Sequence, residues 1–136
     1  MRHFFSRLKR NEKGQGLVEF GLVVLPLLII ILGIIEFGWL FNAQITVTSA
    51  AREGARVGAV LNNEIAIKDA VISHVSSSGL YQLDYSDIDV DFPEGLKEVR
   101  VFVEGNVRPL VGFFVRDNVV LNGSAIMRLE YLVGDD

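Results

Sequence analysis

The sequence predicts an α+β protein in which a long N-terminal transmembrane helix continues into a small outer domain with an antiparallel sheet of about three or four strands. Three observations predict it. Residues 20–35 contain no charged side chain and are dominated by Leu, Ile and Val. The chain then becomes rich in small residues at helical spacing. After residue 88, apolar and polar residues alternate as in half-buried strands.

The apolar run, extended to Trp39, has about the 20 residues that a helix needs to cross a bilayer. A buried core helix is the poorer interpretation, because the run is apolar on every face. A cleaved secretory signal also fits poorly. The run is longer than the usual apolar region, and Phe41 occupies the −3 position before the nearest plausible cut, after Ala43. We therefore expect a transmembrane helix over residues 15–41.

A short basic leader, residues 1–14, precedes this helix. It holds five basic residues against the single acid Glu12: Arg2, Arg7, Lys9, Arg10 and Lys13. By the positive-inside rule the N-terminus stays in the cytoplasm, and residues 42–136 form an extracytoplasmic domain anchored by a single pass in the cell (inner) membrane. Binding of nucleic acid is not needed to explain the basic run, since an anionic leaflet retains it.

Two acids, Glu19 and Glu36, flank the apolar run. A carboxylate near hydrocarbon is costly unless it is paired, protonated or able to reach water. Glu36 can be explained by a position among the outer headgroups beside Trp39, a residue type that favours the interface. Glu19 has apolar neighbours on both sides, so a partner for it is expected.

Pro26 is predicted to kink the long helix, because it removes one backbone hydrogen bond. Residues 42–61 continue the helix with a stripe of small residues that includes Gly54 and Gly58. Glycines four apart suggest close approach by another element, which is either a sheet of the same chain or a sister subunit. A polar face is predicted at Arg52, Glu53 and Arg56.

The outer domain is expected to contain a second helix over residues 64–77, capped by Asn62-Asn63 and ended by a Ser-Ser-Ser-Gly run. Strands are predicted at about 88–92, 98–105 and 119–133. The turn at residues 93–95 joins the first two as a hairpin, and the apolar segment 109–114 is a crossover or a short helical turn.

Catalytic and metal chemistry has little support. The chain has no cysteine and only two histidines, far apart, and it lacks a phosphate-binding glycine loop or a nucleophile motif. Four aspartates between residues 84 and 91 lack the glycine and terminal glutamate of a calcium loop, and alternation explains two of them. We expect no enzyme activity, cofactor, metal, nucleic acid or small-molecule substrate.

Residues 13–20, KGQGLVEF, resemble a type IV prepilin processing site: a basic leader, a glycine, four residues, then glutamate and an aromatic residue. The longer run from Gly14 to Ala59 is similar to the TadE-like family of the tight-adherence (Flp-type) pilus system. It includes a second signature, AAREGAR, at residues 50–56.

The resemblance implies a pilin-like outer domain and cleavage between Gly14 and Gln15 by a membrane prepilin peptidase. It also implies that Glu19, followed by Phe20, pairs with the new N-terminal amine of a neighbouring subunit. The implied function is that of a minor pilin or pseudopilin in assembly of a Tad (type IVb) pilus, with other pilins of the same system as partners. The alternative is an uncleaved single-pass anchor whose outer domain binds an envelope partner. Packing of Pro26, Gly54, Gly58 and the polar face against the outer domain or a sister subunit is a further hypothesis.

Overall fold

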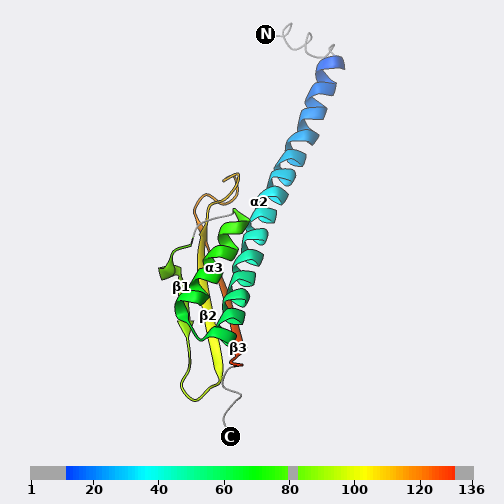
Figure 1. Cartoon of the computed structure of the whole chain (residues 1–136). Coiled ribbons are helices and arrows are strands. Elements are labelled where there is room, and N and C mark those ends of the chain that lie inside the picture. Colours follow the sequence, from blue (N-terminus) through cyan, green and yellow to red (C-terminus); the bar gives the residue numbers. More distant parts are fainter. Residues whose placement is uncertain (1–11, 80–82, 131–136) are drawn as a thin grey trace. The chain divides into compact units, whose positions relative to one another are not determined.

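The computed structural model describes residues 12–79 and 83–130. The chain forms two compact units, the first ending at Ile35 and the second beginning at Glu36. The elements in chain order are two helices, a 3₁₀ turn and three strands (Figure 1): α2 (Glu12–Leu61), α3 (Glu64–Ser78), η1 (Tyr85–Asp87), β1 (Ile88–Asp91), β2 (Glu98–Val107) and β3 (Val119–Arg128).

Helix α2 is a single element of 50 residues that includes Pro26. The predicted transmembrane helix and its continuation are therefore parts of one helix, which begins inside the predicted leader; the basic residues before Glu12 lie outside the described part. Helix α2 ends at Leu61, where Asn62 adopts a left-handed conformation with φ of 44°. Asparagine tolerates this conformation better than most residues, so it ends the helix at low cost.

Helix α3 begins with a side-chain cap. The Asn63 Oδ1 atom accepts hydrogen bonds from the N–H groups of Ile65 and Ala66, at 3.0 and 3.3 Å. The helix ends at Gly79, whose φ of 67° is the left-handed cap that favours glycine. Its buried residues are Ile67, Val71 and Val75.

The sheet has the order β1-β2-β3, with both pairs antiparallel. The turn between β1 and β2 is closed by a hydrogen bond of 3.2 Å from the Leu96 N–H to the Pro93 carbonyl, with Gly95 at a φ of 77°. Strand β3 ends at Arg128, earlier than expected; residues 131–133 of the predicted strand lie outside the described part. The chain leaves the strand there, because the Glu130 N–H bonds the Ala59 carbonyl of α2 at 2.9 Å.

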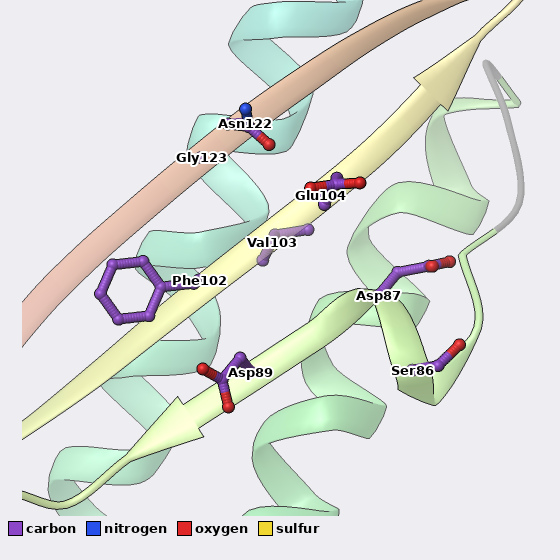
Figure 2. Close-up of a pocket in the computed structure, with 8 residues that line it drawn as sticks. All are labelled: Ser86, Asp87, Asp89, Phe102, Val103, Glu104, Asn122 and Gly123. Carbon is purple, nitrogen blue, oxygen red and sulfur yellow. The ribbon is translucent and has the colours of Figure 1, made fainter.

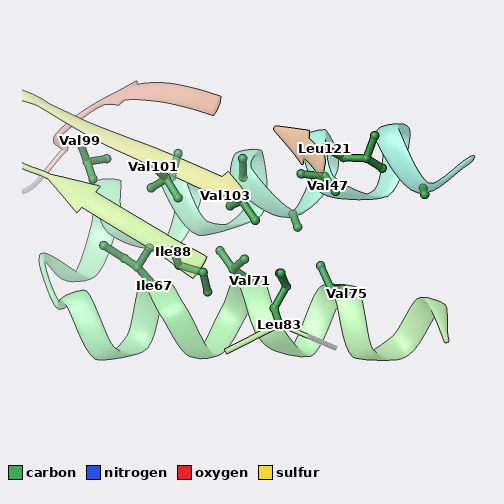
Figure 3. Close-up of a cluster of buried hydrophobic side chains, with 14 of the residues drawn as sticks. Val47, Ile67, Val71, Val75, Leu83, Ile88, Val99, Val101, Val103 and Leu121 are labelled. Carbon is green, nitrogen blue, oxygen red and sulfur yellow. The ribbon is translucent and has the colours of Figure 1, made fainter. Parts of the chain in front are cut away.

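The second unit has two layers. Helix α3 and the part of α2 after residue 42 lie on one face of the sheet (Figures 1 and 3). Most of the larger core side chains come from α3 and the strands, whereas α2 contributes mainly alanines together with Val47. The fully buried α2 residues of the core are Ala43, Val47, Ala50, Ala51 and Ala55. The predicted α+β class, with its long apolar helix and antiparallel sheet, is confirmed.

Candidate membrane-helix and assembly site

The first half of α2 exposes its apolar side chains within the single chain. Leu17, Phe20 and Leu22 are 72%, 66% and 71% exposed. Within the described residues, α2 is the one helix long and apolar enough to cross a membrane, judged by length and composition. A helix that exposes apolar side chains all round needs hydrocarbon or protein as its surroundings. This supports a membrane anchor.

Glu19 has a partner inside its own chain. The Gln15 amide donates a hydrogen bond of 3.2 Å to the Glu19 Oε1 atom, one helical turn away. Gly14 and Gln15, on either side of the predicted cleavage point, both lie within α2. Glu19 and Phe20 are exposed. A neutral amide satisfies part of the hydrogen-bonding capacity of the carboxylate but does not neutralise its charge.

Pro26 and the predicted polar face lie on exposed parts of α2. Pro26, Arg52 and Arg56 are exposed, and Glu53 is intermediate. Arg56 donates to Glu53 through two nitrogens, at 2.6 and 3.0 Å. An exposed i,i+3 pair of this kind contributes at most a few tenths of a kcal/mol. These charges therefore remain available at the surface of the single chain.

Gly54 and Gly58 lie where α3 and β2 meet α2. A Cβ atom on Gly54 would come within 2.5 Å of the Val71 Cγ2 atom, and one on Gly58 within 2.8 Å of the Ile67 Cδ1 atom. The same Cβ atom on Gly58 would lie 3.0 Å from the Val99 Cγ2 atom of β2. Of the two explanations left open by the sequence, close approach within the same chain accounts for both glycines.

Glu36 differs most from its expected position. Its side chain is fully buried rather than extended toward headgroups. Its two carboxylate oxygens accept hydrogen bonds from the backbone N–H groups of Gly112 and Phe114, at 2.8 and 3.0 Å. Hydrogen bonds to a charged group contribute roughly 1.5–3 kcal/mol each, which offsets part of the cost of burying the carboxylate.

The segment that Glu36 holds, residues 108–118, connects β2 to β3 and contains no helical turn. Gly112 has a φ of 71° there, a conformation that L side chains rarely adopt. The Trp39 indole N–H adds a hydrogen bond of 3.1 Å to the Arg108 carbonyl. Sequence reasoning missed this site, because Glu36 is 76 and 78 residues from Gly112 and Phe114. The only signals were an acid directly after an apolar run and a glycine within a distant apolar segment.

The outer face of the sheet carries a shallow acidic groove of about 300 Å³ (Figure 2). Its acidic residues are Asp87, Asp89 and Glu104. His74, on the exposed side of α3, does not line it. In the part of the chain that the structure describes, no three His, Cys, Asp or Glu side chains are grouped to hold a metal ion.

Residues 14–56 match the family model described as TadE-like protein, and this range contains both sequence signatures. No curated protein matches the chain, and no solved structure does. The match supports a protein associated with a Tad pilus, and the exposed apolar helix supports a membrane anchor. The predicted resemblance to the TadE-like family is therefore confirmed over residues 14–56.

Proposed function

We propose that the protein is a minor pilin, or pseudopilin, that takes part in assembly of a Tad (Flp-type) pilus. It acts through contacts between subunits and without catalysis. In this proposal the chain is inserted in the inner membrane with its N-terminus in the cytoplasm. A prepilin peptidase removes the leader between Gly14 and Gln15.

The observation that carries the proposal is the position of Glu19. Glu19 lies within the matched range, is exposed, and stands in the first part of α2 between exposed apolar side chains such as Leu17 and Phe20. Cleavage would place a charged amine on Gln15 and make Glu19 the fifth residue of the mature chain. An amine from a neighbouring subunit can neutralise Glu19, which the Gln15 amide does not.

Processing is tested by N-terminal sequencing of the protein extracted from membranes. A mature chain that begins at Gln15 is expected. Replacing Gly14 with a bulky residue should leave the precursor intact, whereas Gly21→Ala, in open space on the same helix, should be processed normally. A wild-type chain that still begins at Met1 contradicts the proposal.

Assembly is tested by Glu19→Gln, which keeps the shape of the side chain and removes its charge. We expect this variant to be missing from sheared pili while it remains in the membrane. Glu94→Gln is the matched control, because Glu94 is exposed in the turn between β1 and β2 and lies outside the matched residues 14–56. Equal incorporation of both variants would show that the charge of Glu19 has no role in assembly.

One observation favours a second candidate, an uncleaved single-pass anchor with a partner-binding outer domain. The hydrogen bond from Gln15 gives Glu19 a partner within the intact chain. An anchor predicts that the leader persists and that Glu19→Gln is tolerated. The sequencing and incorporation experiments therefore separate the two candidates.

A further inference from the structure

We propose that the loop between β2 and β3, residues 108–118, is a second membrane contact that inserts its apolar tip into the outer leaflet of the bilayer. The tip is defined here as residues 110–114. Its side chains are exposed although they are large and apolar: Leu110 54%, Val111 41%, Phe113 54% and Phe114 45%.

The tip lies next to the residues at which the apolar run of α2 ends. Glu36 directly follows that run and accepts two hydrogen bonds from the tip, and the ring centroids of Phe37 and Phe114 are 6.3 Å apart. Phe37 and Phe41 are themselves 49% and 68% exposed. With Leu40 and Leu121 they line an almost wholly apolar groove of about 200 Å³. The exposed apolar surface formed by Phe37 and Phe41 of α2 thus continues onto the loop through the contact of Phe37 with Phe114.

The hydrogen bonds of Glu36 indicate lipid rather than water around the tip. A loop in water can leave its backbone N–H groups to solvent. Two such groups, on Gly112 and Phe114, are instead bonded by a buried carboxylate. Satisfying backbone donors from within the protein is the requirement that hydrocarbon imposes.

The residues that flank the tip have the chemistry of a lipid interface. Arg108 and Arg116 are exposed on either side of it, where their charges can reach phosphate headgroups. Trp39 joins α2 to the Arg108 carbonyl, and tryptophan favours the depth of the headgroups. The apolar tip therefore suits the hydrocarbon of the leaflet, and the two arginines and the tryptophan that flank it suit the adjacent headgroup region.

The opposite end of the sheet provides a matched control. Leu96, in the turn between β1 and β2, is 51% exposed, nearly the same as Phe113. Because β2 runs from Glu98 to Val107 between the two loops, they lie at its opposite ends. The proposal places Phe113 in lipid and Leu96 in water, although the exposure of the two side chains in the chain alone is alike.

The absence of cysteine from the chain allows a direct test. Full-length Phe113→Cys and Leu96→Cys variants would each be labelled with nitrobenzoxadiazole and reconstituted in phosphatidylcholine vesicles at a high lipid-to-protein ratio. The expected result is that lipids spin-labelled on the acyl chain quench the label at 113 and that aqueous dithionite reduces it slowly. The label at 96, on outward-facing chains, should be reduced rapidly and not quenched.

Equal dithionite access at the two positions would overturn the proposal. So would protection of position 113 that appears only at a low lipid-to-protein ratio, since a second copy of the chain would then be covering the loop. Val111→Cys repeats the measurement if labelling at 113 disturbs the fold, which circular dichroism would show. These outcomes do not depend on cleavage of the leader, so they stand apart from the test of the proposed function.

Glu36 is assigned as the positioning residue of this loop. Glu36→Gln keeps one oxygen acceptor and loses the other, so one of the two backbone N–H groups loses its partner. We expect loss of most of the lipid quenching at position 113 with no change at position 96. Full quenching at 113 in this variant would show that Glu36 does not hold the loop at the membrane.

Discussion

Gly123 of β3 lies against the backbone of Val47 in α2 so closely that a Cβ atom on Gly123 would come within 2.8 Å of the Val47 carbonyl oxygen. The Gln44 side chain donates a hydrogen bond of 2.9 Å to the Asn122 carbonyl beside this contact. Helix and strand therefore meet backbone to backbone, and neither can move aside as a flexible side chain can.

We expect Gly123→Ala to destabilise the outer domain by about 1–3 kcal/mol, the usual cost of overpacking against a rigid neighbour. Thermal unfolding of the full-length chain in detergent, followed by circular dichroism, measures the change. Gly38→Ala is the control, because nothing lies within 4 Å of a Cβ there. An unchanged midpoint in Gly123→Ala would contradict the close approach.

Gly54 and Gly58 of α2 differ in the side chain that an added methyl group would contact. At Gly54 it would meet a γ-methyl of Val71, a β-branched side chain that is stiff at χ1; at Gly58 it would meet the terminal methyl of Ile67. We predict that Gly54→Ala destabilises more than Gly58→Ala, as measured by chemical denaturation. Val71→Ala should restore part of the loss in Gly54→Ala, with a coupling energy of about 1 kcal/mol. Additive effects of the two substitutions would show that they do not touch.

The cap of α3 gives a third prediction. Asn63→Ala removes the acceptor for the Ile65 and Ala66 N–H groups and should cost about 1 kcal/mol. Asn63→Asp should keep the stability close to wild type, because aspartate caps equally well and its charge favours the helix N-terminus. The comparison is made by thermal unfolding of both variants. An equal loss in the two would mean that the side-chain cap is not what matters at this position.

The Tyr85 hydroxyl donates a hydrogen bond to the Asp69 carboxylate, which raises the pKa of Tyr85 above its usual value. A group whose pKa is higher in the folded state stabilises the fold. Its contribution is present in full below the unfolded pKa, about 10 for tyrosine, and is lost as the pH rises through the folded pKa. The wild-type minus Tyr85→Phe difference in absorbance titration isolates this group. In Asp69→Ala the inflection should move to lower pH; an unmoved inflection would rule out Asp69 as the cause.

The predictable and unpredictable parts of this fold differ in the range of the interactions behind them. Alternation along Ile88 to Asp91 and the asparagine before α3 are local signals, and both elements form where expected. The end of β3 was not predictable, because it depends on a hydrogen bond from Glu130 to Ala59 in another element.

The same distinction applies to the candidate site. Glu19 could be singled out by its immediate neighbours, and the TadE-like signatures are contiguous in sequence. The position of Glu36 could not be deduced, because it depends on the conformation of a loop more than 70 residues away. The sequence left two explanations for Gly54 and Gly58, and only the packing of α3 and β2 distinguishes them.

The inclusion of Gly14 and Gln15 in α2 has a consequence for any protease that acts on the bond between them. A peptide bond within a helical turn is not presented in the extended form that a protease cleft grips, so the first turns must unwind before cleavage. Glycine lowers helix stability by about 1 kcal/mol relative to alanine, and glycines stand on both sides of Gln15. Local melting at this end of the helix therefore costs less, and the ease of fraying, as well as the residues themselves, would help such a protease to select this bond.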